Sequence, residues 1–141
     1  MATSNPTASG VIFGPTNSGK MYLSTFKHRG TGSPVYKSVW SPAVPPQMEY
    51  AIFALADDGN WQCSSGHYWG IHIHTDDRPM ELGKDGERLC KFPRTANGSD
   101  PWHGYPVFSN EDAPPDEFVE QWRISGVINR IIAKRIQKGK L

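Results

Sequence analysis

Three shortages in the sequence each exclude a class of protein. Only two cysteines are present, Cys63 and Cys90, which is too few for the disulfide framework of a small secreted domain. Lys and Arg number 15 against 14 for Asp and Glu, so the net charge gives no argument for a nucleic-acid, membrane or acidic partner. The longest apolar run, residues 50–56, is far shorter than the roughly 20 residues that cross a bilayer. We therefore expect a cytoplasmic protein that does not span a membrane.

What the sequence does contain is the composition of one folded domain. A chain of 141 residues, of which 37% are hydrophobic and 11% aromatic, has enough length and apolar content to bury a single core. Residues 1–9 contain almost nothing that could be buried, and they predict a disordered tail. The expected organisation is therefore one domain over residues 10–141.

Short strands are expected up to about residue 92. Gly, Pro, Asn and Asp interrupt the apolar runs in this part of the chain, which is typical of strands joined by tight turns. The dipeptides Asp58-Gly59 and Asp85-Gly86 tolerate the positive φ of a hairpin, so they predict antiparallel connections. The expected strands cover residues 11–13, 21–26, 35–40, 50–56, 68–74 and 88–92.

The remainder of the chain predicts a loop and then a helix. Residues 93–115 contain five prolines and no apolar period, which favours a long ordered loop. After this loop, Phe118, Val119 and Trp122 are spaced to share one helical face, and Gly126 marks the end of that helix.

A second helix with a basic face is expected to follow. Its apolar stripe consists of Ile128, Ile131, Ile132 and Ile136. The cations of this region are Arg123, Arg130, Lys134, Arg135, Lys138 and Lys140, and no acidic residue follows Glu120. Such a face could bind the phosphates of nucleic acid, but solvated cations opposite an apolar stripe are also the ordinary surface of a packed helix. The acidic residues between 111 and 120 could neutralise it as well.

These elements together predict an α+β fold. It consists of a twisted, mostly antiparallel sheet of about six short strands, followed by the long Pro-rich loop and two C-terminal helices packed on one face of the sheet. In this arrangement Phe118, Trp122, Ile128, Ile131, Ile132 and Ile136 pack against Ile52, Leu55, Trp69, Ile71 and Ile73.

The segment Gly14-Pro-Thr-Asn-Ser-Gly-Lys20 matches a phosphate-binding loop up to its lysine. The next residue is Met21, where such a loop needs Ser or Thr for magnesium, and a strand rather than a helix is expected to follow. An acidic partner would be sought at Asp57, after the apolar run. We interpret the glycines as hairpin residues instead.

Four of the five histidines lie between residues 67 and 103. On a strand, His72 and His74 point the same way and lie roughly 6.5 to 7 Å apart, so both could bind one divalent metal ion, with Asp76 or Asp77 completing the site. Without metal, His72, His74 and His103 could act as general base and acid. Imidazoles on the polar face of a strand with no ligand at all are the third interpretation.

A second candidate segment is Asp100-Pro-Trp-His-Gly-Tyr-Pro-Val107. Two prolines fix its backbone, and Trp102, His103 and Tyr105 offer surfaces for stacking and hydrogen bonding. Alternatively, Trp102 and Tyr105 plug the open end of the sheet. Arg78, Lys91 and Arg94 are near enough in sequence to supply a cation for phosphate.

Two functions remain open on these residues. The leading hypothesis is a binding module that recognises a phosphate-bearing ligand, which includes nucleic acid, or a protein partner; its ligand-binding residues are His67, Arg78, Arg94, Trp102 and Tyr105. The alternative is a small hydrolase acting on phosphodiesters, ribonuclease-like or metal-dependent, with His72, His74 and His103 as catalytic residues and His72 and His74 as metal ligands. The sequence does not decide whether the protein is an enzyme. An edge strand could also pair with its twin, so a homodimer stays open.

Overall fold

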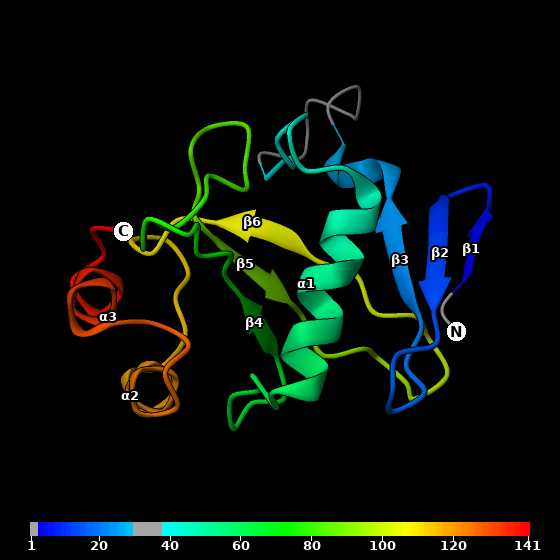
Figure 1. The fold of residues 1–141 in the computed structure, drawn as a ribbon. Helices are drawn as coiled ribbons and strands as arrows, with labels where there is room; N and C mark the ends of the chain where they lie inside the picture. The colour runs from blue at the N-terminus through cyan, green and yellow to red at the C-terminus, as the bar shows by residue number, and fades with distance from the viewer. Residues whose placement is uncertain (1–2, 30–37) are drawn as a thin grey trace.

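The computed structural model describes residues 3–29 and 38–141, and within these ranges it has two three-stranded antiparallel sheets and three α-helices (Figure 1). The first sheet contains β1 (Thr3–Pro6), β2 (Gly10–Gly14) and β3 (Tyr22–Thr25), and the second contains β4 (Tyr68–Gly70), β5 (Leu89–Phe92) and β6 (Tyr105–Val107). The helices are α1 (Pro46–Asp58), α2 (Asp116–Ile124) and α3 (Arg130–Gln137), and a short 3₁₀ turn, η1 (Phe26–His28), follows β3. This arrangement confirms the α+β class with antiparallel strands.

Strand β1 occupies part of the segment that the sequence assigned to a disordered tail. Thr3 to Pro6 pair with β2 in antiparallel register, from Thr3 opposite Gly14 to Pro6 opposite Val11. All four side chains of β1 are exposed, so the strand is held by main-chain hydrogen bonds and not by burial. A search for residues that can be buried cannot detect such a strand.

Residues 50–56, expected as a strand, lie inside helix α1, and that expectation is wrong. Pro46 occupies the first turn, where its fixed φ suits a helix and its missing N–H costs nothing. Ile52, Phe53 and Ala56 face the core while Leu55 is 54% exposed, a pattern with helical rather than strand period. Alanine, a strong helix former, makes up much of this run.

The second sheet differs from expectation at both edges. Strand β4 ends at Gly70 instead of continuing to His74, and beyond it only Ile73 forms an isolated bridge, with Pro79. Strand β6 lies within the expected loop, where Leu89 pairs with Val107. Pro106 is tolerated because β6 has a ladder partner on one side only, so its missing N–H costs little.

Half of the expected strand at residues 35–40, residues 35–37, lies outside the described residues. Of its described part, Trp40 forms an isolated bridge with Gly83. The indole Nε1 of Trp40 donates a hydrogen bond to the carbonyl of Gly104 at 3.1 Å, which ties this segment to the start of β6.

The residues around Trp102 join the two sheets. Trp102 forms a parallel bridge with Tyr22, its N–H donates to the carbonyl of Met21 at 2.8 Å, and its carbonyl accepts from the N–H of Leu23 at 2.6 Å. Because this segment continues into β6, it connects β3 to the second sheet. The two sheets therefore form one interrupted, twisted surface.

Helices cover both faces of the second sheet, not one. Helix α1 packs on one face, in a core cluster that contains Ile52, Phe53 and Phe92 (Figure 1). Helices α2 and α3 pack on the other face, against Trp69, Ile71, Leu89 and Val107. The expected contact of the C-terminal helices with Ile52 and Leu55 is consequently wrong, because α1 carries these residues on the opposite side. Ile131 is also outside the core, at 69% exposed. In the described ranges no helix has the length and apolar character needed to cross a membrane.

Candidate functional site

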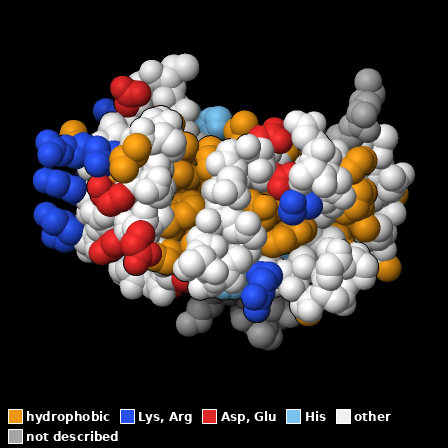
Figure 2. All heavy atoms as spheres, turned by 90° about the horizontal axis from the view of Figure 1, so that it is seen from below, with side chains coloured by type: hydrophobic (Ala, Val, Ile, Leu, Met, Phe, Trp, Pro, Cys, Tyr) orange, Lys and Arg blue, Asp and Glu red, His pale blue; other side chains and the backbone are white. Residues whose placement is uncertain are grey.

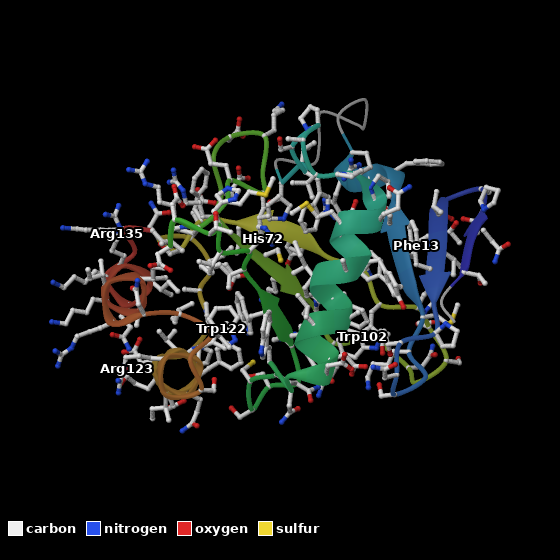
Figure 3. All side chains as sticks on the ribbon, viewed as in Figure 1. Phe13, His72, Trp102, Trp122, Arg123 and Arg135 are labelled. Carbon is white, nitrogen blue, oxygen red and sulfur yellow. The ribbon has the colours of Figure 1, made fainter. Side chains whose placement is uncertain are left out.

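The side chains that the sequence grouped as one site lie in three places. His72, His74 and Arg78 belong to the irregular segment that follows β4. His67 and Tyr105 lie near Lys91 on β5, Arg94 contacts His67, and His103 lies near His28. Trp102 packs among core aromatics, with its ring centroid 5.7 Å from that of Phe53 and 5.0 Å from that of Tyr68, so it plugs the sheet junction. Figure 3 shows Trp102 beside α1 and well apart from His72.

His72 and His74 lie side by side, with ring centroids 5.6 Å apart and planes nearly perpendicular. Their backbone is held by hydrogen bonds to the returning segment: Met80 N–H donates to the His72 carbonyl and His74 N–H donates to the Arg78 carbonyl, each at 2.8 Å. Asp76 accepts from the N–H of Arg78, which stabilises the turn. Within residues 3–29 and 38–141, no group of three or more His, Cys, Asp or Glu could hold a metal ion. Among the described residues, His72 and His74 therefore have no third side chain that would complete a metal site with them.

The second group lies on the face of the sheet that α2 and α3 cover only in part. The ladder sets Lys91 opposite Trp69 on one side and opposite Tyr105 on the other, so the three side chains share a face. The Lys91 ammonium lies 5.2 Å from the Trp69 ring centroid and 2.9 Å from a carboxylate oxygen of Asp112. Lys91 is thereby fixed in position with its charge next to the Tyr105 ring.

His28 reaches the same place from η1. Its ring stacks on Tyr105 with centroids 5.1 Å apart and an interplanar angle of 29°. Its Nδ1 lies 2.8 Å from the Ser38 carbonyl, which can only accept, so Nδ1 carries the hydrogen. In the neutral ring, Nε2 then carries the lone pair. We call His28, His67, Lys91, His103 and Tyr105 the sheet-face cluster.

The three histidines of the sheet-face cluster have lowered pKa values. Burial lowers the pKa of His28, and the charges of His103 and Lys27 lower it further. Burial and the charge of Lys27 lower the pKa of His103. Burial, Lys91 and Arg94 lower the pKa of His67. At neutral pH these imidazoles are therefore uncharged, and each can accept one hydrogen bond and donate another.

His67 and Tyr105 complete the polar groups of the cluster. The Nδ1 of His67 accepts a hydrogen bond from the N–H of Arg94 at 3.0 Å, so the Nε2 of its neutral ring carries the hydrogen. Burial raises the pKa of Tyr105, which keeps its phenol protonated and able to donate. Of these residues, sequence reasoning missed His28. It stands far from the other histidines along the chain, and no spacing signal connects it to Tyr105.

We found no family model, no curated protein and no solved structure that matches this chain. The function must therefore be argued from the geometry.

The phosphate-loop-like segment is not arranged for phosphate. It forms the β2–β3 hairpin and is followed by a strand, so no helix N-terminus faces it. The Lys20 ammonium lies 2.9 Å from Asp57 and donates to the hydroxyl of Ser18 at 2.8 Å. Ser18 in turn donates to the other Asp57 oxygen at 2.5 Å. The polar groups of the loop thus dock it on the end of α1, which favours the hairpin interpretation.

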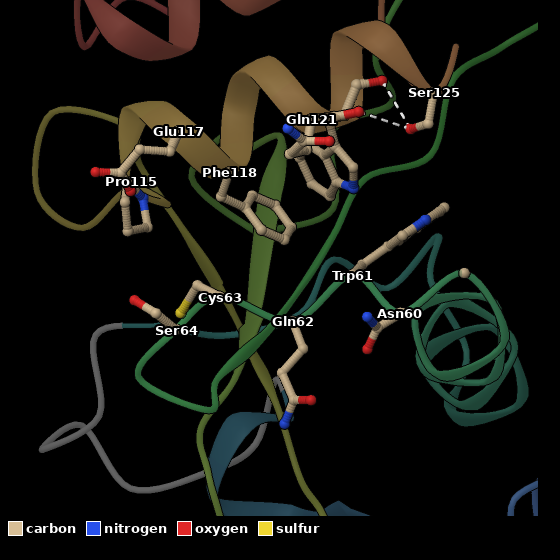
Figure 4. A pocket seen from close by; sticks show the side chains of 12 residues that line it. Asn60, Trp61, Gln62, Cys63, Ser64, Pro115, Glu117, Phe118, Gln121 and Ser125 are labelled. Atoms are coloured by element: carbon tan, nitrogen blue, oxygen red, sulfur yellow. Dashed lines mark hydrogen bonds between the residues drawn. The ribbon is translucent and has the colours of Figure 1, made fainter.

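A pocket of about 410 Å³ lies between residues 59–64 and α2 (Figure 4). Trp61 and Phe118 give it an apolar lining, and Glu117 is its one charged residue. Without a cation this pocket does not suit a phosphate. A second pocket, of about 520 Å³, is lined by His74, by the cations Arg78, Arg88 and Arg135, and by the carboxylates Asp77 and Glu81.

Proposed function

We propose that the protein is a binding module for a phosphate-bearing ligand and that the sheet-face cluster is its binding surface. The observation that carries this proposal is the stacking of His28 on Tyr105, which the β5–β6 register sets beside Lys91. An ammonium, a phenol and imidazoles are thereby brought to one patch. The ammonium of Lys91, the phenol of Tyr105 and the Nε2–H of His67 can each donate a hydrogen bond that a phosphate oxygen accepts.

The charge around the cluster supports an anionic ligand. Lys27, Lys91 and Arg94 each lower the pKa of a cluster histidine, so their positive charges act on the patch. Asp112 is the carboxylate paired with Lys91 there. A bound phosphate would favour the charged imidazoles, so ligand binding should raise the histidine pKa values.

The test is isothermal titration with adenosine 5′-monophosphate and with inorganic phosphate. The variant His103→Gln/Tyr105→Phe removes an imidazole and a hydroxyl while retaining the ring that stacks on His28. We expect it to bind at least tenfold more weakly. The control is Lys84→Gln/Arg123→Gln, which removes two exposed charges outside the cluster and should change the affinity less than twofold. Equal affinity of the cluster variant and the wild type, or no binding of either compound by the wild type, would overturn the proposal.

A second candidate function is phosphodiester cleavage at the same cluster. The observation that favours it is that His28 and His103 lie close enough for the charge of His103 to lower the pKa of His28. One neutral imidazole would take the proton of a ribose 2′-hydroxyl as its oxygen bonds to phosphorus. The other, protonated, would give a proton to the 5′-oxygen as its bond to phosphorus breaks. In the described ranges no hydrogen bond or ring contact joins His103 to His72 or His74.

This candidate is tested with the dinucleotide uridylyl-adenosine. Cleavage should give a cyclic phosphate with a bell-shaped pH profile, and His28→Gln or His103→Gln should each slow it at least a hundredfold. The deoxy analogue, which has no 2′-hydroxyl, should stay intact. Cleavage that persists in both variants would assign the activity to other residues.

A further inference from the structure

The positive charge of the chain concentrates at its C-terminal end. From residue 121 onward the sequence has six Lys and Arg side chains and neither Asp nor Glu. Arg130 and Lys134 on α3 and Lys138 at its C-cap are exposed, while Ile132 and Ile136 are buried. Figure 2 shows Lys and Arg side chains gathered at the end of the molecule that carries α2 and α3.

The acidic residues of α2 neutralise this charge only in part. Among the described residues no ion pair joins a carboxylate of α2 to a cation of α3: Arg123 lies 3.1 Å from Glu120 within α2, and the charge of Arg130 contributes to lowering the pKa of Glu120. Glu120 also accepts a hydrogen bond from Gln137, an uncharged residue of α3. Arg135 donates to the carbonyl of Lys140 and not to a carboxylate. The cations of α3 therefore face solvent.

The second pocket lies beside this face. Its volume is about 520 Å³, and its lining includes three arginines, Arg78, Arg88 and Arg135, two carboxylates, Asp77 and Glu81, and apolar residues such as Ile132. Arg88 pairs with Glu81 at 3.3 Å and Arg78 with Asp76 at 3.8 Å. These are exposed ion pairs, which are weak and can be exchanged for a stronger anion.

We infer that the pocket and the outer side of α3 bind the phosphate backbone of a nucleic-acid strand. We call Arg78, Arg88, Arg135, Arg130, Lys134 and Lys138 the basic surface. A guanidinium group can donate two parallel hydrogen bonds to one phosphate, and three arginines line this pocket. Arg130, Lys134 and Lys138 recur every fourth residue, so they form a row with steps of about 6 Å along α3. A row of cations leading to an arginine pocket suits a chain of phosphates better than a single one.

A membrane surface fits the same residues less well. Helices that lie on a membrane insert an apolar face into lipid. The isoleucines of α3 instead pack in the protein core, apart from Ile131, which is exposed. The basic surface shares no residue with the sheet-face cluster, so this inference does not rest on the proposed function.

The test is fluorescence anisotropy with a labelled single-stranded 12-nucleotide RNA at 50 and 200 mM salt. Each phosphate contact contributes about −0.7 to the slope of log affinity against log salt concentration. We expect a wild-type slope of −2 or steeper, from three or more contacts. Arg78→Gln/Arg135→Gln should weaken binding at 50 mM salt at least tenfold and make the slope shallower by about 1.4.

The matched control is Lys84→Gln/Arg123→Gln, which removes the same charge from exposed positions outside the basic surface. It should keep the wild-type slope and lose less than threefold in affinity. An equal loss in both variants would indicate non-specific attraction and overturn the inference. Binding to vesicles that contain phosphatidylserine, without binding to RNA, would overturn the assignment to nucleic acid.

Discussion

The ammonium of Lys20 lies 2.9 Å from the carboxylate of Asp57, whose side chain is 3% exposed. Lys20 lies in the loop between β2 and β3, and Asp57 lies in the last turn of α1. Tyr68 adds a hydrogen bond to Asp57 from β4 at 3.3 Å. This carboxylate therefore connects the first sheet, the helix and the second sheet.

Asp57→Asn should destabilise the fold. Burial alone would raise the pKa of Asp57, but hydrogen bonds from Ser18 and Lys20 bring it below its usual value. The variant leaves Lys20 without its ion pair, and we expect a loss of about 1–3 kcal/mol in the free energy of unfolding by urea. In the wild type, the contribution of Asp57 is present above the unfolded pKa of about 3.9 and is lost as the pH falls through the lower folded value. A variant that unfolds at the wild-type urea concentration would show that the pair is not stabilising.

Glu49 should be the most sensitive polar residue of the core. It is 1% exposed, and its oxygens accept hydrogen bonds from Tyr22, Ser24 and Arg29, each at 2.7 Å. Glu49→Ala leaves these buried donors without an acceptor and should lower the free energy of unfolding by about 3–5 kcal/mol. The double variant with Arg29→Met should cost less than the sum of the single changes, because both remove the same ion pair. Additive losses would contradict this coupling.

Stability should fall in mild acid because of the sheet-face histidines. The folded pKa values of His28 and His103 are lower than the usual 6.5, mainly through burial. The unfolded chain then binds protons first, so stability is full above pH 6.5 and decreases as the pH falls through the folded values. The measurement is urea unfolding between pH 5 and 7.5. The double variant His28→Gln/His103→Gln should flatten this dependence, and an unchanged slope would place the titrating groups elsewhere.

Two adjacent isoleucines of α3 provide a matched pair. Ile132 is 5% exposed and Ile131 is 69% exposed. Ile132→Asp buries an unpaired charge and should abolish cooperative thermal unfolding. Ile131→Asp adds the same charge in solvent and should change the free energy of unfolding by no more than about 0.5 kcal/mol. Similar losses in both variants would mean that the α3 register differs from the one described.

The C-terminal helices could be predicted because their apolar residues recur with helical period over a sufficient length. Phe118, Val119 and Trp122 are all buried, as expected for one face of α2. The run at residues 50–56 could not be assigned in the same way, since a short apolar stretch fits a buried strand and a helix equally well. Strand β6 escaped notice because a proline such as its Pro106 is typical of loops, although an edge strand tolerates one.

The candidate site was predictable only as a set of residue types. His103 and Tyr105 were found because they share one aromatic segment, and Lys91 because it lies near them in sequence. Their partner His28 comes from a different sheet edge, and its stacking on Tyr105 depends on how β3 joins the segment around Trp102. Spacing along the chain carries no information on such a contact.

The sequence by itself determined the α+β class and the two C-terminal helices, because these follow from local conformational preference and the period of apolar residues. The hairpin turn expected at Asp58-Gly59 was wrong, because these residues end helix α1. The tertiary structure alone decided that α1 carries Ile52 on the opposite face of the second sheet from the C-terminal helices, that Trp102 packs against the core, and that the candidate histidines divide between two surfaces. The physical reason is that burial and side-chain proximity depend on contacts between segments distant along the chain, and the order of residues does not specify these distances locally.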